Sequence, residues 1–327
     1  MIVIIGSGKG TSWIKNILNN TIKREDSIFV NQEEELIHNA FIRGFYKLLN
    51  HKKTRFLMEF LRPLFFKSIT SSFSKDTHYL VQLNWNSLSY DKRFLGFIRK
   101  EYPDCKTILL LTASMDTSKK FFLKYCTSLS EVINIFDFVC SFDKKDCKLF
   151  GLTYIPLMYG GIDCSQVSLS NEYDLCYVGS AKNRLSFIHE IYNELSNKGL
   201  KLVFYVNGVG ESDMKYSGIV YNQRLSYEQT ISISAKSKCI MEIIEEGQSF
   251  STIRLGESIF LNKKLLTNNV EITHSEYYDK NYIITTNSEI DRIVDFIHSP
   301  IAYAMHPKVS LMHEIELIRY LEKTLNK

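Results

Sequence analysis

One stretch, residues 238–269, constrains the fold more than any other part of the chain. It begins with a short apolar run, and runs of this length with β-branched residues are typical of a strand buried in a parallel sheet. Two glutamates and a glycine follow, and then Ser249 and Ser251, whose hydroxyls suit the start of a helix. A helix over about 250–261 and a second strand over 264–267 complete a strand–turn–helix–strand unit. The pattern predicts a parallel α/β sheet.

The start of this helix is also a candidate binding site. Free N–H groups and the positive end of a helix dipole suit a phosphate. Arg254 and Glu257 lie three residues apart, on one face of the helix and close to its start. Two interpretations stay open at this point. The pair contacts a bound nucleotide, or each side chain is only the other's partner on the surface of an ordinary βαβ unit.

The alternation of strands and helices runs through both halves of the chain. The segment 156–172 interrupts it with Pro, two Gly and several Ser or Asn residues, which is typical of a linker, and the pattern then restarts at 174–178. A length of 327 residues accommodates two α/β domains with full cores. We expect each half to be a doubly wound parallel sheet.

Composition and charge exclude several classes of protein. Apolar residues make up 45% of the chain and charged residues 23%, as in ordinary soluble proteins. No apolar run approaches the roughly 20 residues that span a bilayer, and the N-terminus resembles no signal peptide, so we expect a cytoplasmic protein. A net charge of +4 is too small to indicate a nucleic-acid partner. The seven cysteines and eight histidines show no zinc-ligand spacing.

One region, residues 41–75, is basic and apolar at once, with eight Lys or Arg and a single acid interleaved with Phe and Leu. Such a stretch can lie on an anionic membrane surface, which would place the protein at the inner face of the cytoplasmic membrane. The alternative is a pair of helices that packs its apolar side chains into the core and leaves its charges in water.

The first predicted strand, Met1 to Ile5, ends in a glycine-rich turn, Gly6-Ser7-Gly8-Lys9. It is similar to a P-loop, but Val3 stands where that motif requires its first glycine, and Lys9 is followed by Gly rather than Ser or Thr. A nucleotide kinase is therefore the weaker alternative. A glycine-rich turn at the end of a first strand also lets a substrate approach the backbone closely.

Several segments taken together resemble GT-B glycosyltransferases of bacterial capsule, lipopolysaccharide and exopolysaccharide clusters. They are Glu242-Ile243, Glu246 to Ser249, Thr252 to Arg254, Glu257, Asn262 to Lys264, Thr267 to Asn269, and upstream Phe136-Asp137, Ser141 to Asp143, Tyr154 to Leu157, Tyr173-Asp174 and Tyr177 to Ala181.

The resemblance implies two Rossmann-like, doubly wound domains that face each other across a cleft. The expected divisions are an acceptor-binding domain over 1–160, a linker over 161–172, a nucleotide-sugar-binding domain over 173–300, and a last helix over 301–327 that packs back on the first domain.

The implied activity is transfer of a sugar from a nucleotide-sugar donor to a glycan or lipid-linked acceptor. The donor-binding residues that the resemblance and the loop positions indicate are Gly179, Ser180, Lys182, Arg184, Tyr227, Glu246, Gln248, Ser249, Thr252, Arg254 and Glu257, and the glycine-rich turn from Gly6 to Lys9 is expected on the acceptor side. Within this set, Lys182, Arg184 and Arg254 suit the diphosphate, and Glu257 is placed to accept from ribose hydroxyls.

The chemistry expected of the site is metal-independent and inverting. No Asp-x-Asp pair for a divalent cation occurs, and no Glu-x7-Glu pattern of retaining enzymes falls at Glu242 or Glu246. An inverting transfer needs a general base, for which we favour Asp116 over Asp91 and His78, because it follows the strongest strand of the first half. A helix-capping role explains Asp116 nearly as well. No cofactor is expected, and a non-catalytic nucleotide-sugar-binding partner of polysaccharide assembly remains an alternative.

Overall fold

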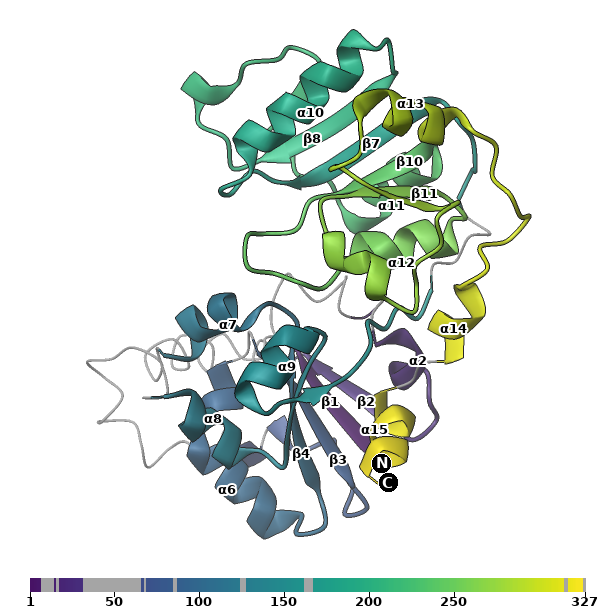
Figure 1. Cartoon of the computed structure of the whole chain (residues 1–327). Coiled ribbons are helices and arrows are strands. Elements are labelled where there is room, and N and C mark those ends of the chain that lie inside the picture. Colours follow the sequence, from purple (N-terminus) through teal and green to yellow (C-terminus); the bar gives the residue numbers. More distant parts are fainter. Residues whose placement is uncertain are drawn as a thin grey trace. The chain divides into compact units, whose positions relative to one another are not determined.

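The computed structural model describes residues 1–6, 15, 18–31, 66–67, 69–84, 87–123, 128–161, 167–314 and 317–325. The chain divides into two compact units (Figure 1). The first unit comprises Met1–Lys15 and Thr21–Pro156, and the second comprises Asn16–Asn20 and Leu157–Lys327. Each unit contains one six-stranded sheet, so the expected pair of parallel α/β sheets is confirmed.

The sheet of the first unit has the strand order β2-β1-β3-β4-β5-β6, and every neighbouring pair is parallel. Its strands are β1 (Ile2–Gly6), β2 (Ser27–Asn31), β3 (Tyr79–Leu83), β4 (Lys106–Leu111), β5 (Phe138–Ser141) and β6 (Thr153–Tyr154). The α-helices between them in the described part of the chain are α2 (Asn19–Ile22), α6 (Lys92–Glu101), α7 (Met115–Phe122), α8 (Leu129–Ile135) and α9 (Lys144–Phe150).

Apolar runs explain why these segments form central strands. All five residues of β1 are buried, as are five of the six in β4, because both faces of the sheet are covered. Helix α6 packs Phe94 and Ile98 onto one such face, against Val3, Ile5 and Leu80 of β1 and β3. Its start is capped by Asp91, whose carboxylate accepts from the backbone N–H of Arg93 (3.0 Å).

The sheet of the second unit has the order β12-β11-β10-β7-β8-β9, again with parallel neighbours. Its strands are β7 (Tyr173–Ser180), β8 (Leu202–Asn207), β9 (Ile219–Tyr221), β10 (Ser237–Glu242), β11 (Lys264–Thr267) and β12 (Ile283–Thr285). The helices are α10 (Leu185–Asn197), α11 (Tyr227–Ala235), α12 (Ile253–Phe260), α13 (Ile290–His298), α14 (Val309–Glu314) and α15 (Leu317–Leu325).

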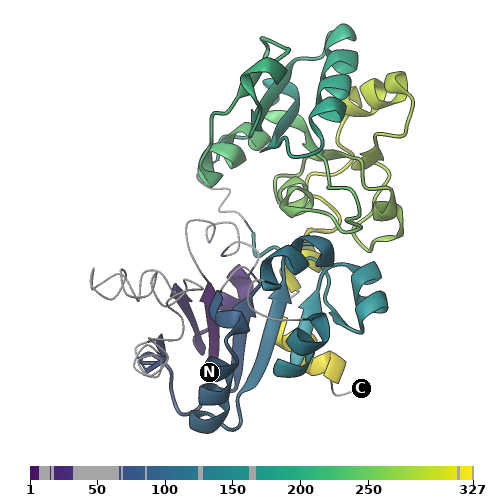
Figure 2. The ribbon, with the colours of Figure 1, turned by 90° about the vertical axis from the view of Figure 1, so that its left-hand side faces the viewer.

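Helices cover both faces of this second sheet. Helices α10 and α13 contact each other and one face, and α11 and α12 contact each other and the opposite face, as Figures 1 and 2 show. The core between the sheet and the first helix pair includes Leu175, Ile188, Phe204 and Met241. Because helices cover both faces of the sheet, the loops that follow the strands lie at the edge where the strands end.

Some predictions concern residues that lie outside the described ones. These include Ser7, Gly8 and Lys9 of the glycine-rich turn and most of the basic region 41–75. Residues 157–160, expected in the first domain, belong to the second unit, as do α14 and α15. Packing of the last helix on the first domain stays a prediction. Among the described residues, no helix is long and apolar enough to cross a membrane.

Candidate functional site

The candidate site lies at the carboxyl edge of the second sheet, where the strand order reverses. Strand β7 pairs with β10 on one side and with β8 on the other, and the chain continues outward in opposite directions from these two neighbours. Loops that follow β7 and β10 therefore diverge and leave a crevice between them. Ligands of open α/β sheets bind in such crevices, outside the carboxyl ends of the strands.

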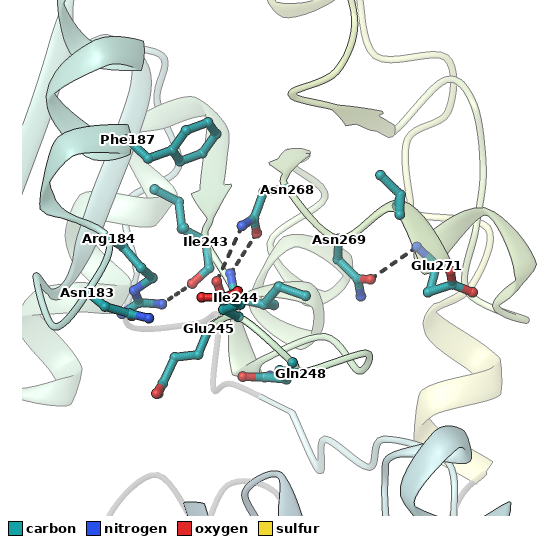
Figure 3. A pocket seen from close by; sticks show the side chains of 13 residues that line it. Asn183, Arg184, Phe187, Ile243, Ile244, Glu245, Gln248, Asn268, Asn269 and Glu271 are labelled. Atoms are coloured by element: carbon teal, nitrogen blue, oxygen red, sulfur yellow. Dashed lines mark hydrogen bonds between the residues drawn. The ribbon is translucent and has the colours of Figure 1, made fainter. Parts of the chain in front are cut away.

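A pocket of about 380 Å³ occupies this position (Figure 3). It is lined by the start of α10, by the loop after β10 and by the segment after β11. The lining residues are Asn183, Arg184, Phe187, Ile243, Ile244, Glu245, Glu246, Gly247, Gln248, Asn268, Asn269, Val270 and Glu271. Three residues predicted from the sequence, Arg184, Glu246 and Gln248, are among them.

Arg184 is held rigidly across the two loops of the reversal point. Its guanidinium donates to the carbonyl oxygen of Ile243, after β10, and to that of Ser180, at the end of β7 (2.7 Å). Figure 3 shows the side chain directed toward Ile243. The Nε atom is buried and has no hydrogen-bond partner within the described part of the chain. Arg184 thus brings a fixed positive charge to the pocket wall.

Lys182 precedes Arg184 in the same turn and contacts the opposite loop differently. Its ammonium group forms an ion pair with the carboxylate of Glu245. The backbone of Lys182 lies in the left-handed region, with φ of 44°, which residues with a side chain rarely adopt. Strained backbone of this kind is concentrated at ligand sites. Gly179, two residues before the turn, is required because a Cβ there would lie 2.6 Å from the Tyr177 hydroxyl.

Amide side chains shape the rest of the pocket. Asn268 holds the loop after β10, since its amide accepts from the N–H of Ile244 (2.7 Å) and donates to the carbonyl of the same residue (3.3 Å). Asn269 donates to the hydroxyl of Ser251 (3.2 Å), and Gln248 donates to the carbonyl of Phe250 (2.8 Å). Of the charged lining residues, Arg184 is positive, and Glu245, Glu246 and Glu271 are negative.

A carboxylate of the protein itself, that of Glu242, binds the start of α12. Glu242, buried at the end of β10, accepts from the backbone N–H and the hydroxyl of Thr252 (2.5 and 2.9 Å) and from the hydroxyl of Thr267 (2.7 Å). Burial raises the pKa of Glu242, and these hydrogen bonds oppose the rise. The N–H of Thr252 is therefore already paired, which reduces the number of donors that a phosphate could use there.

The expected capping residues of α12 are wrong. Thr252 is the N-cap, and its hydroxyl accepts from the N–H of Arg254 (3.2 Å), whereas Ser251 accepts from Asn269 instead. The helix consequently begins at Ile253, three residues later than the sequence predicts. The hydroxyl of Thr252 is used in this cap, and Ser249 lies in the loop before the helix.

Arg254 and Glu257 are each other's partner, but not on an exposed surface. Their side chains form an ion pair in which Arg254 is 17% exposed and Glu257 is 0% exposed. Arg254 also donates to the carbonyl of Val178 in β7 (3.1 Å). Burial raises the pKa of Glu257, and Arg254 counteracts this rise. The alternative of a surface pair is corrected to a buried pair that ties α12 to the central strand.

Two tyrosine hydroxyls complete this cluster, in which Tyr159 is buried and Tyr227 is half-buried. Tyr227, at the start of α11, is hydrogen-bonded through its hydroxyl to that of Tyr159. Burial, followed by the charge of Glu257, raises the pKa of Tyr227 well above its ordinary value. None of Tyr227, Arg254 and Glu257 lines the pocket described above. Of the predicted donor residues, Arg184, Glu246 and Gln248 line this pocket, and the remaining ones that do not are Gly179, Ser180, Lys182, Ser249 and Thr252.

In the first unit, Asp116 is exposed in the first turn of α7. It is not the cap of that helix: the hydroxyl of Ser114 accepts from the N–H of Thr117 (3.4 Å). Asp91 is engaged as the cap of α6, and His78 precedes β3 and so lies at the amino edge of the sheet. Asp116 is the one of these three that lies near the carboxyl edge without a capping role.

Two further residues of the first unit were not singled out from the sequence. Asp146 is buried and accepts from the N–H of Met115 (2.6 Å), and burial raises its pKa. Gln82, buried in β3 beside the reversal point between β1 and β3, has neither amide atom hydrogen-bonded within the described residues. A glutamine inside the apolar run YLVQL is a signal that the sequence does contain.

Metal ligands do not gather in any described part of the chain. No group of three His, Cys, Asp or Glu side chains is arranged there as it would be around an ion. The predicted metal independence remains a prediction, because it depends on how the reaction proceeds.

No protein-family model matches the chain, and no curated protein matches it. Solved structures do match over nearly its whole length. An α,α-trehalose-phosphate synthase (UDP-forming) from Burkholderia vietnamiensis is 8% identical, covers 99% of this chain and 98% of its own, and has a TM-score of 0.57. The trehalose-6-phosphate synthase OtsA is 8% identical with the same coverage and a TM-score of 0.60.

A Listeria monocytogenes protein described as a UDP-N-acetylglucosamine 2-epimerase is 11% identical, with coverage of 91% and 88% and a TM-score of 0.53. At such identities the likeness shows the fold alone. The chain has the GT-B fold of two Rossmann-like domains, as the sequence predicts. Because the structures with this fold include both synthases and a protein described as an epimerase, the fold by itself does not specify the reaction.

Proposed function

We propose that this protein is a glycosyltransferase that takes its sugar from a nucleotide-sugar donor. The observation that carries the proposal is the pocket at the reversal point of the second sheet, with Arg184 in its wall and Lys182 ion-paired to Glu245, another residue of that wall. Open α/β sheets bind ligands in this crevice. The fold also occurs in a synthase described as UDP-forming, and UDP is what remains when a sugar leaves a UDP-sugar.

Residues in the pocket wall, and Lys182 next to it, suit different parts of such a donor. Lys182 and Arg184 are the cations placed to stabilise the diphosphate as the sugar departs. A carboxylate accepts from hydroxyl groups and an amide can both accept and donate, so Glu246 and Gln248 suit the sugar or the ribose. Arg254 and Glu257 then support the site indirectly, because they fix α12 against β7.

The finer parts of the proposal rest on the sequence. The absence of an Asp-x-Asp pair supports a metal-independent reaction, and the absence of Glu-x7-Glu at Glu242 and Glu246 supports inversion. Asp116 is the proposed general base. The resemblance to polysaccharide-cluster enzymes supports a glycan or lipid-linked acceptor in the synthesis of a bacterial surface polysaccharide. The basic region 41–75 is the proposed contact with an anionic membrane.

Turnover of nucleotide sugars tests this function. The full-length protein is incubated with a panel of UDP-, GDP-, dTDP- and CMP-sugars, with EDTA present, and free nucleotide is measured with and without glycan acceptors. We expect release of nucleoside diphosphate from one donor, and inversion at the anomeric carbon of the product. Epimerised donor sugar would instead indicate an epimerase. Donor binding without any turnover would support the alternative of a non-catalytic partner, and phosphoryl transfer from ATP in a separate assay with Mg²⁺ would support the kinase.

A further inference from the structure

We propose that Glu245 is a resident counter-ion of Lys182 that an incoming diphosphate displaces, so that the charge of Glu245 weakens binding of the donor. The proposal rests on the function proposed above and names a residue that sets the affinity of that site. The sequence gives no reason to select Glu245, since its partner is 63 positions away.

The two residues meet because their strands are neighbours. Lys182 lies in the turn after β7, and Glu245 lies in the loop after β10, and these parallel strands are hydrogen-bonded to each other. Both side chains are reached by solvent, Lys182 being 49% and Glu245 30% exposed. The pair therefore spans the crevice at a point that a ligand can also reach.

The two cations of the turn differ in their freedom to bind a ligand. The Arg184 guanidinium is committed to two carbonyl oxygens, those of Ile243 and Ser180, on both sides of the crevice. The Lys182 ammonium group is paired with a carboxylate on one side of the crevice, and the four-carbon stem of lysine lets that group turn. Lys182 is thus the cation that can change partners from a carboxylate to a phosphate.

The charge of the pocket makes such an exchange necessary. Three carboxylates, those of Glu245, Glu246 and Glu271, line the pocket against the one guanidinium of Arg184. A diphosphate that entered with all of them in place would face repulsion, and the nearest ammonium group would already be neutralised. Displacing Glu245 from Lys182 relieves both effects. Removing the charge of Glu245 should therefore tighten binding of a diphosphate.

Titration calorimetry with inorganic pyrophosphate and with UDP tests this inference on the full-length protein. Four proteins are compared with the wild type: Glu245→Gln, Lys182→Ala, the double variant, and Glu246→Gln as a matched control. Glu246 is the adjacent carboxylate of the same pocket and has no ion pair with Lys182 in the described structure. With pyrophosphate, which has no sugar or ribose for Glu246 to bind, this variant measures the effect of removing one negative charge without breaking the pair.

We expect Glu245→Gln to bind pyrophosphate about fivefold more tightly, the scale of one exposed ion pair. Glu246→Gln should show a clearly smaller gain, and Lys182→Ala should bind more weakly than the wild type. In the Lys182→Ala background the Glu245→Gln gain should largely disappear, and in the wild-type background it should shrink at high salt. Thermal unfolding midpoints should stay close to that of the wild type, because the pair is exposed.

Unchanged or weaker pyrophosphate binding by Glu245→Gln would overturn the inference, as would an equal gain in Glu246→Gln or no binding by any of the proteins. The result is distinguishable from failure of the proposed function. Tighter pyrophosphate binding by Glu245→Gln without turnover of any nucleotide sugar would support the counter-ion role of Glu245 and contradict the transferase function. Turnover of a nucleotide sugar, combined with unchanged pyrophosphate binding by Glu245→Gln, would support the transferase and overturn the counter-ion role of Glu245.

Discussion

Replacing Glu257 with glutamine measures how much the buried pair with Arg254 contributes to folding. Glu257 is 0% exposed and Arg254 17% exposed, so the variant leaves a guanidinium without its counter-ion in surroundings that water hardly reaches. The carbonyl of Val178 remains as a neutral acceptor. Loss of one partner of a buried pair costs about 3–5 kcal/mol, whereas an exposed helix pair contributes about 0.5 kcal/mol.

Equilibrium unfolding in urea, followed by circular dichroism, distinguishes these magnitudes. We expect the free energy of unfolding to fall by about 3 kcal/mol or more in Glu257→Gln. Asp291→Asn is the matched control, because its pair with Lys198 in the same unit is exposed (76% and 41%), so its loss should change stability by less than about 1 kcal/mol.

A double variant distinguishes loss of the ion pair from a general loss of folding. Arg254→Met combined with Glu257→Leu removes both charges and should recover most of the lost stability. If Glu257→Gln unfolds within about 1 kcal/mol of the wild type, the pair behaves as an exposed one and the burial argument is wrong.

Three other predictions concern single side chains. Desolvation lowers the pKa of buried His306 from 6.5 to about 4, so the folded state disfavours the charged form of this side chain. Stability should therefore fall as the pH drops from about 6.5 toward 4. The pH dependence of the urea midpoint over this range should become flatter in His306→Gln but not in the control His298→Gln, whose ring is exposed. Gln82→Met should raise the free energy of unfolding by about 1–3 kcal/mol, because it removes a buried amide with no partner among the described residues, and an unchanged or lower midpoint would show that the amide is satisfied. Gly256→Ala should destabilise by about 1–3 kcal/mol, because the new Cβ would lie 2.5 Å from the Tyr159 ring, whereas Gly96→Ala in α6 meets nothing within 4 Å and should stabilise the protein.

The fold could be predicted from the sequence because its signals are local. Apolar runs of four to six residues, separated by helical patterns, mark the buried strands, and β11 has the predicted bounds. Strand β9 gives no such signal. At three residues, β9 is too short to show a period.

The site could be predicted only in part. Arg184, Glu246 and Gln248 follow strand ends, and strand ends meet at one edge of a parallel sheet, so position along the sequence was informative. Burial of Arg254 and Glu257 was not predictable in this way. Arg254 contacts Val178 and Glu257 contacts Tyr227, and both partners come from other elements of the second unit.

Titration of UDP in the presence of EDTA tests the central claim, that the pocket after β7 and β10 holds the diphosphate of a nucleotide-sugar donor. The wild type should bind UDP without metal. Lys182→Ala, which removes an exposed side chain, should bind it about tenfold or more weakly while keeping the wild-type unfolding midpoint. UDP binding that requires Mn²⁺ or Mg²⁺, or equal affinity in the wild type and Lys182→Ala, would contradict the account.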